Sequence, residues 1–260
     1  MPTLPHKILI HLDTQTFKVY RLAGGCATQV LSHPAHLPFN PTIEQLQDKV
    51  DGFLLDMSTH FGVLDNHRVR IYATGVFQDY PPGMANQLVI HIYVHHGLYL
   101  NVVPRDLSSF YSNLAASHNG SSDIIHGLVQ QEFRQVVVCG SFQHHFTDLG
   151  RIVTLLRQRN VHVLSPWTTK LIPETVGTNF VRLEGQPPLI NERDGWTHRS
   201  IHMDKFRQSD AIIICNPGGH IGRGTTFELG YMCALYKRII FTDDPIDLSP
   251  PFPYEVGLNF

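Results

Sequence analysis

The first half of the chain is dominated by segments in which apolar and polar positions partly alternate. Residues 67–77 and 86–104 are rich in β-branched side chains, and this pattern predicts strands. Residues 6–23 predict two more strands around a polar turn at residues 13–16. The chain up to about residue 130 is therefore expected to be rich in strands.

One segment of the first half has the signature of a helix. Residues 40–62 begin with Asn40, a residue type that often caps helices, followed by Pro41 at the expected first helical position. Glu44 then falls in the expected first turn, where the helix dipole favours a carboxylate. A single clear helix is predicted in this half.

The second half alternates near-continuous apolar runs with amphipathic ones. Continuous apolar runs predict strands buried on both faces, and the amphipathic runs between them predict helices. This order is typical of a parallel sheet with helices on both faces. Strands are predicted at residues 134–141, 161–166, 211–217 and 238–244, and helices at residues 147–160, 199–210 and 225–238.

A small, polar stretch with a Gly-Ser break, residues 112–127, separates the two halves and predicts a loop. We therefore divide the chain into residues 1–130 and residues 131–260. The predicted fold class is α/β. A carboxyl-terminal Rossmann- or flavodoxin-like parallel sheet, with helices on both faces, is preceded by a smaller strand-rich α+β domain.

Composition and charge exclude several classes of partner. Apolar residues make up 42% of the chain and charged residues 16%, with a formal net charge of -2 and no basic block. A nucleic-acid partner is therefore not expected. No run of eighteen apolar residues exists, so a membrane partner is not expected either. The first residues lack the features of a signal peptide, which favours a cytoplasmic location.

Cysteines and histidines do not predict a metal site. The four cysteines have no C-x-x-C spacing, and Cys139 and Cys215 lie inside apolar runs, which favours buried reduced thiols. The chain has 17 histidines, but they form no HExxH motif. His91 and His95 would share one face of the predicted strand, where solvated side chains are the favoured interpretation.

A glycine-rich stretch near residue 220 matches neither common phosphate-binding loop. Gly219 and Gly224 have the spacing of a P-loop, but the lysine that should follow is absent. Gly222 and Gly224 fit the first two positions of a dinucleotide-binding fingerprint, whereas Phe227 occupies the third. An ATPase loop and a dinucleotide site are therefore both disfavoured.

Two interpretations of Glu228 remain open from the residues alone. It is a solvated glutamate in the first turn of a helix that Thr225 or Thr226 caps, or it is a reactive carboxylate. The second interpretation depends on location, because ligands bind beyond the carboxyl ends of parallel strands. An ionised carboxylate at that edge can stabilise or attack the anomeric carbon of a sugar. Three loops share the edge, at residues 140–141, 165–167 and 216–226.

The segments "GSF" at 140–142 and "SDAIIICNPGGHIGRGTTFELGYMCALYKRIIF" at 209–241 resemble the nucleoside 2-deoxyribosyltransferase family. They also resemble its relatives that hydrolyse deoxynucleoside monophosphates at the N-glycosidic bond. The resemblance covers about residues 133–245. It implies an enzyme that hydrolyses or transfers at the N-glycosidic bond of a nucleoside, nucleotide or related N-riboside, with Glu228 as the nucleophile. The expected substrate-binding residues are Gly140, Ser141, Phe142, Asp210, Asn216, Gly219, Gly222, Gly224 and Thr225.

One departure from the family pattern affects the expected proton donor. The family has an aspartate eight residues before the position of Asp210, and this chain has His202 there. Proton transfer to the leaving base would then fall to His202 or to Asp204, although Asp204 points elsewhere on a helix.

The resemblance implies no metal or redox cofactor, because the carboxylate and the leaving base supply the chemistry. The expected partner is a small nucleoside or nucleotide. Family members often complete their sites across a subunit contact, so the resemblance allows a homo-oligomer. A non-catalytic module that senses a nucleotide or nucleotide sugar is the alternative. Residues 6–23 weakly resemble the first hairpin of actin-like ATPase folds, and a partial fold of that type is one interpretation of the first half.

Overall fold

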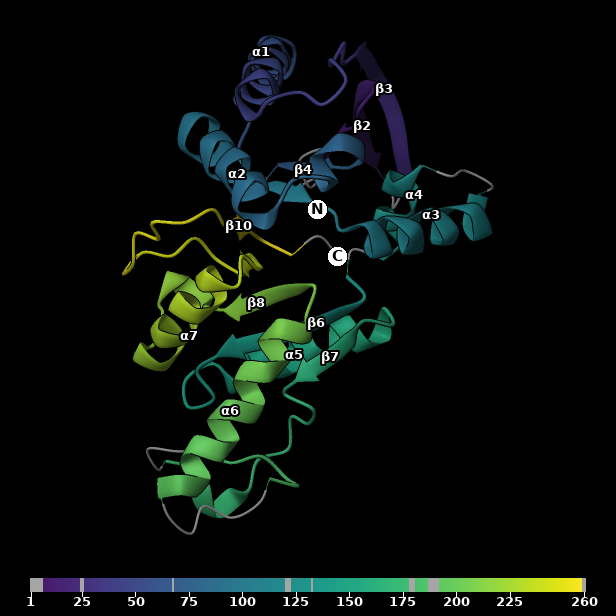
Figure 1. Cartoon of the computed structure of the whole chain (residues 1–260). Coiled ribbons are helices and arrows are strands. Elements are labelled where there is room, and N and C mark those ends of the chain that lie inside the picture. The colour runs from purple at the N-terminus through teal and green to yellow at the C-terminus, as the bar shows by residue number, and fades with distance from the viewer. Residues whose placement is uncertain are drawn as a thin grey trace. The chain divides into compact units, whose positions relative to one another are not determined.

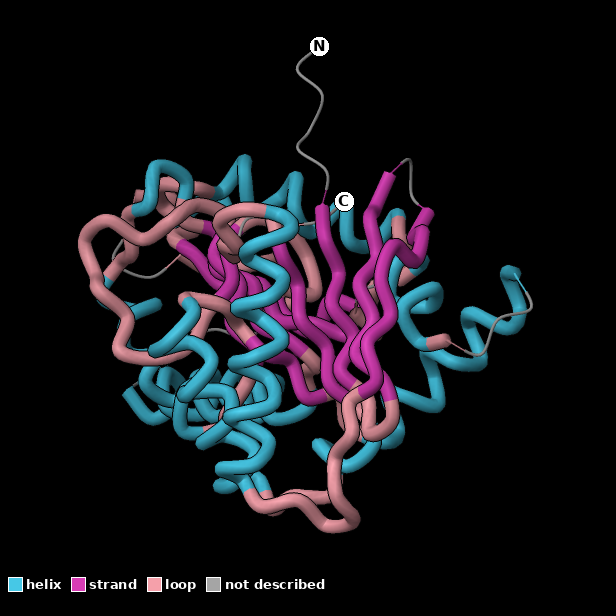
Figure 2. Tube along the Cα trace, turned by 90° about the horizontal axis from the view of Figure 1, so that it is seen from above, coloured by secondary structure: helices cyan, strands magenta, loops and turns pink. Residues whose placement is uncertain are grey.

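A computed structural model describes residues 7–23, 26–66, 68–119, 123–131, 133–177, 181–186 and 192–258. The chain divides into two compact units, Met1–Glu132 and Phe133–Phe260, which are described separately. Both units contain strands and helices (Figure 1, Figure 2). The general α/β class with two sheets is confirmed.

The amino-terminal unit is built on a mixed sheet. The predicted hairpin at residues 6–23 is present, and the N–H of Asp13 donates to the carbonyl of Thr16 at 3.0 Å to close its turn. The strands run in the order β3-β2-β1-β4-β5, antiparallel between the first three and parallel from β1 onward. They are β1 (Lys7–Leu12), β2 (Thr16–Ala23), β3 (Cys26–Pro34), β4 (Val69–Ala73) and β5 (Leu100–Val102). The likeness to a partial actin-like ATPase fold stays a prediction.

Helices are more numerous in this unit than the sequence predicted. The expected helix is α1, and its cap is Thr42 rather than Asn40. The Thr42 hydroxyl accepts from the N–H of Gln45 while the Gln45 side chain accepts from the N–H of Thr42, a reciprocal capping box. The helical segments are α1 (Ile43–Phe61), η1 (Gly75–Gln78), α2 (Pro82–His96), α3 (Arg105–Asn119) and α4 (Ile124–Gln130).

The strand predicted over residues 86–104 is wrong for most of its length, because its first part belongs to α2. Pro82 lies in the first turn of α2, and Gly97 adopts the left-handed conformation that ends a helix. Leu88 and Ile92, one helical turn apart, are buried in the core that α1 also lines. Packing of this helical face thus overrides the strand preference of the β-branched residues.

The loop predicted over residues 112–127 is also mostly helical. The end of α3 and the start of α4 occupy the described part of this stretch. Asp123 caps α4 by accepting from the N–H of Ile125 at 3.1 Å. The same carboxylate accepts from Lys18 at 3.1 Å and from the Tyr20 hydroxyl, so it ties α4 to the sheet.

The carboxyl-terminal unit has the predicted parallel sheet. Its strands lie in the order β10-β9-β8-β6-β7. If β6 is counted as the first strand of this unit and the sheet is read from β7, the order is 2-1-3-4-5, which is the flavodoxin-like order. All four strand pairs are parallel. The strands are β6 (Gln135–Gly140), β7 (His162–Ser165), β8 (Ala211–Cys215), β9 (Arg238–Phe241) and β10 (Glu255–Val256).

Helices cover both faces of this sheet, as predicted. Leu149 and Val153 of α5 pack on one face, and Phe206 of α6 packs with Leu229 of α7 on the other. The helical segments are α5 (Phe146–Gln158), η2 (Pro173–Thr175), α6 (Glu192–Gln208), η3 (Pro217–Gly219) and α7 (Arg223–Ala234). In the described part of the chain, no helix combines the length and the apolar character needed to cross a membrane.

Candidate functional site

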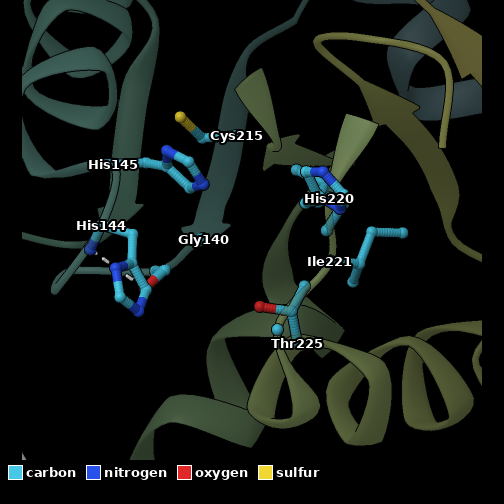
Figure 3. A pocket seen from close by; sticks show the side chains of 10 residues that line it. Gly140, His144, His145, Cys215, His220, Ile221 and Thr225 are labelled. Carbon is cyan, nitrogen blue, oxygen red and sulfur yellow. Dashed lines mark hydrogen bonds between the residues drawn. The ribbon is translucent and has the colours of Figure 1, made fainter. Parts of the chain in front are cut away.

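A cavity of about 160 Å³ lies at the carboxyl ends of β6 and β8. These strands are neighbours in the sheet, but the chain continues from them toward opposite edges, so the cavity occupies the topological switch point. Figure 3 shows His144 and His145 on one side of the cavity, and His220 and Thr225 on the other. Its lining is Gly140, Ser141, His144, His145, Ile214, Cys215, His220, Ile221, Gly222 and Thr225.

Two glycines give the backbone the shape that the cavity requires. A Cβ on Gly140 would lie 2.7 Å from the carbonyl oxygen of Cys215, so only glycine lets β6 and β8 end side by side there. Gly219 has φ +82°, and a Cβ on it would lie 2.4 Å from the carbonyl oxygen of Asp244. Both positions therefore need glycine for the course of the chain.

The loop after β8 is fixed by polar contacts from the segment after β9. The buried Asn216 side chain donates to the carbonyl of Asp243 at 2.8 Å. The Asp243 carboxylate accepts from the N–H of Gly218 at 3.0 Å, and Asp247 accepts from the N–H of Ile221 at 3.0 Å. This last hydrogen bond lowers the pKa of Asp247. The loop is thus held in place before any ligand arrives.

Two helices begin at the cavity. His145 is the N-cap residue of α5 and Gly222 is the N-cap residue of α7, and neither helix start has a capping side chain. The first N–H groups of a helix have no partner within the helix, and with the helix dipole they favour an anion. The first turn of α7 contains no acidic residue, whereas that of α5 contains Asp148. The start of α7 is therefore the stronger anion-binding element.

Cys215 lines the cavity but is not suited to act as a nucleophile. Burial, together with the nearby charges of Asp148 and Asp243, raises the pKa of its thiol to about 12. The thiolate is the reactive form of cysteine, and this form is scarce at neutral pH when the pKa is so high. Cys215 thus contributes packing to the wall of the cavity.

A second polar cluster joins β6, β7, α6 and α7. Nε2 of His202 lies 3.3 Å from Oε1 of Glu228, and Nδ1 of His202 lies 3.1 Å from Oγ of Ser165. The Sγ atom of Cys139 also lies within 4.8 Å of a carboxylate oxygen of Glu228. Burial, and then the charge of Glu228, raise the pKa of Cys139 well above its usual value. The cluster joins four polar side chains that are distant in sequence.

The predicted substrate-binding residues fall into three groups. Gly140, Ser141, Gly222 and Thr225 line the cavity. Asp210 lies at the opposite edge of the sheet, before β8, where its carboxylate accepts from the N–H groups of two residues at the start of β6. The remaining residues, Phe142, Asn216, Gly219 and Gly224, shape the surrounding loops or the first turn of α7 without appearing in the lining.

The residues predicted to carry the chemistry also differ from expectation. The structure begins α7 at Arg223 with Gly222 as its N-cap, so the prediction of Thr225 or Thr226 as the cap is wrong. Glu228 consequently falls in the second turn, and it is not among the residues that line the cavity in the described chain. Its neighbour is His202, whereas the exposed Asp204 pairs with Arg207 at 3.4 Å.

Sequence reasoning missed the histidines of the cavity. His144 and His145 come three and four residues after Ser141, just beyond the end of β6, and that position is the available signal for them. His220 lies in the glycine-rich loop itself. Ser165 belongs to one of the three loops predicted at the ligand-binding edge but was given no role, and Cys139 was predicted only as a buried thiol. Only the fold brings them to His202 and Glu228.

Comparisons with known proteins give no family assignment. No family model matches the chain, and no curated protein matches it. A Ppx/GppA family member of Aquifex aeolicus is similar at 13% identity and a TM-score of 0.31, over 81% of this chain and 66% of that chain. An exopolyphosphatase of Cytophaga hutchinsonii is similar at 12% identity and a TM-score of 0.34, over 81% and 66%. This chain spans about two thirds of the length of those proteins.

These findings correct the predicted family and activity. The solved structures that match include members of the Ppx/GppA family and an exopolyphosphatase, and the predicted resemblance to nucleoside 2-deoxyribosyltransferases is wrong. The predicted cleavage of an N-glycosidic bond by a Glu228 nucleophile is wrong with it. The geometry gives a physical reason, because the Glu228 carboxylate pairs with His202, lies beside Cys139 and is not part of the lining of the cavity.

Proposed function

We propose that this chain binds a small phosphorylated molecule of the nucleotide class, with the phosphate group in the cavity at the ends of β6 and β8. The observation that carries the proposal is the meeting of two helix starts without capping side chains at one cavity. Backbone N–H groups at such positions bind phosphate, and the helix dipole favours its charge.

The side chains of the lining support the same ligand. His144, His145 and His220 offer imidazole N–H groups, and Ser141 and Thr225 offer hydroxyl groups, all of which donate hydrogen bonds to phosphate oxygens. Among the described residues that line the cavity, none carries a carboxylate that would repel an anion. Donors thus surround the space, and the carboxylates of Asp148 and Asp243, whose charges act on Cys215, are not part of this lining.

The size of the cavity limits what it holds. Pockets that enclose whole ligands usually measure roughly 300–1,000 Å³. The volume here is about 160 Å³, which suits one phosphate group or a similarly small fragment. The rest of the ligand therefore extends out of the cavity, beyond the carboxyl ends of the strands.

Isothermal titration with a matched ligand pair tests the proposal. In phosphate-free buffer, AMP is expected to bind at least about tenfold more tightly than adenosine, because the lost charged hydrogen bonds are worth about 1.5–3 kcal/mol. Equal affinity for the two compounds, or no binding of AMP, inorganic phosphate or pyrophosphate, would contradict the proposal.

A matched pair of variants tests whether the ligand binds in this cavity. His144→Ala removes an exposed imidazole of the lining and should weaken AMP binding about tenfold. His162→Ala removes an exposed imidazole at the amino-terminal end of β7, at the opposite edge of the same sheet, and should leave the affinity unchanged. Equal effects of the two substitutions would place the ligand elsewhere.

A further inference from the structure

Three side chains outside the cavity converge on one point. They are Cys139 near the end of β6, His202 on α6 and Glu228 on α7. The Sγ atom of the cysteine, a ring nitrogen of the histidine and a carboxylate oxygen of the glutamate all lie within 4.8 Å of one another. Three elements that are distant in sequence thus bring three metal-ligating side chains together.

We propose that Cys139, His202 and Glu228 bind one divalent transition-metal ion of the zinc class. Thiolate, imidazole and carboxylate are the ligand types that Zn²⁺ takes in proteins. Mg²⁺ and Ca²⁺ are disfavoured because they require oxygen ligands. Three protein ligands leave the fourth tetrahedral position open for water or another small ligand.

The distances fit a tetrahedral ion. Bonds of about 2.0–2.3 Å from zinc to nitrogen, oxygen and sulfur place neighbouring ligand atoms about 3.3–3.8 Å apart. Nε2 of His202 and Oε1 of Glu228 are already 3.3 Å apart. The Cys139 thiol lies within 4.8 Å of both atoms, so small side-chain rotations bring the three ligand atoms to these separations.

The surroundings of His202 orient it as a ligand. Oγ of Ser165 lies 3.1 Å from Nδ1, which leaves Nε2 directed at Glu228. The ring of Phe206 packs edge-on at a centroid distance of 4.7 Å and restricts rotation of the imidazole. Metal-ligating histidines usually have such a partner on the second ring nitrogen.

Access and protons are also consistent with an ion at this point. The side chains of His202 and Glu228 are 28% and 25% exposed, and Cys139 is buried beneath them, so an ion enters from the solvent side and reaches the thiol last. With the ion on Nε2 of His202, the ring carries a proton on Nδ1 and donates it in a hydrogen bond to Oγ of Ser165, while the Cys139 thiol releases its proton to solvent. Ion binding is therefore coupled to release of the thiol proton.

Cobalt spectroscopy tests the proposal on the full chain. Co²⁺ is added under nitrogen to protein that was treated with a chelator. One equivalent should produce a thiolate-to-cobalt charge-transfer band in the near ultraviolet and visible bands typical of tetrahedral cobalt. One equivalent of Zn²⁺ should then remove these bands. Absence of a stoichiometric charge-transfer band would overturn the proposal.

Variants assign the site to these residues. Cys139→Ala should abolish the charge-transfer band. Glu228→Gln and His202→Gln, which alter partly exposed side chains, should weaken Co²⁺ binding at least tenfold while circular dichroism stays unchanged. Ser165→Ala should weaken Co²⁺ binding about ten- to hundredfold, because the His202 ring loses the hydrogen-bond partner that orients it.

Matched controls complete the experiment. Cys233→Ala removes a half-buried thiol outside the cluster, and Asp204→Asn removes an exposed carboxylate two residues from His202. Both should leave the cobalt spectrum and affinity unchanged. A charge-transfer band that survives Cys139→Ala, or that disappears in Cys233→Ala, would overturn the assignment.

Discussion

At the scale of single residues, the shape of the cavity depends on Gly140. Its missing side chain lets the end of β6 lie against Cys215 of β8, where a Cβ would come within 2.7 Å of a carbonyl oxygen. The backbone oxygen cannot move away without disturbing the parallel ladder between the two strands. A side chain at this position must therefore distort both the sheet edge and the cavity.

Gly140→Ala should lower the free energy of unfolding by about 1–3 kcal/mol, the usual cost of overpacking, and should weaken AMP binding. Gly150→Ala is the matched control, because Gly150 lies inside α5 and a Cβ there would meet nothing within 4 Å. That change should stabilise the protein by about 0.5–1 kcal/mol. Urea denaturation of both variants measures the difference, and equal stabilities would contradict the close approach of β6 and β8.

The residue scale also shows where sequence reasoning succeeded and failed at the site. The Gly-Ser end of β6 and the loop with Gly222 and Thr225 were predictable, because continuous apolar strands locate the ligand-binding edge of a parallel sheet. Glu228 was misinterpreted because its place in α7 depends on a helix start at Arg223 that no capping side chain marks. Its contact with His202 arises only from tertiary packing.

At the scale of elements, the two halves of the chain were not equally predictable. In the carboxyl-terminal unit, buried strands such as β6 and β8 are apolar on both faces, so their runs are distinctive. Helix α2 carries β-branched residues that favour a strand, and its helical state depends on Pro82, Gly97 and packing against the core. Local pattern therefore fails where tertiary contacts decide between helix and strand.

Helix α4 depends on a carboxylate that several elements share. Asp123 accepts hydrogen bonds from the N–H of Ile125, from Lys18 and from Tyr20, and lies 3.6 Å from the His11 ring. Burial alone would raise its pKa, but the nearby His11 ring and the hydrogen bond from Tyr20 lower it well below the usual range. In the folded protein the carboxylate thus remains ionised at pH values at which it would take up a proton in the unfolded chain.

A depressed pKa contributes stability above the unfolded value of about 3.9, and this contribution is lost as the pH falls below that value. The free energy of unfolding should therefore decline from about pH 4 downward. Asp123→Asn should reduce stability at pH 7 by about 1.5–3 kcal/mol and flatten that decline. Asp56→Asn, which changes an exposed carboxylate on α1, is the control. Identical pH profiles for Asp123→Asn and the unaltered protein would contradict the shared role of Asp123.

At the scale of the whole molecule, each unit has its own sheet and its own hydrophobic clusters. The cavity is lined entirely by residues of Phe133–Phe260. The described residues proposed to bind phosphate thus all belong to the carboxyl-terminal unit. The topology itself places it, since a 2-1-3-4-5 sheet opens a crevice between its first and third strands.

The central claim is that phosphate binds where α5 and α7 begin, and amide chemical shifts measured by NMR during titration with AMP test it most directly. The account predicts that the largest shifts occur at residues 223–225 and 146–148, that inorganic phosphate reproduces them, and that adenosine does not. Shifts that adenosine produces equally, or shifts concentrated away from both helix starts, would contradict it.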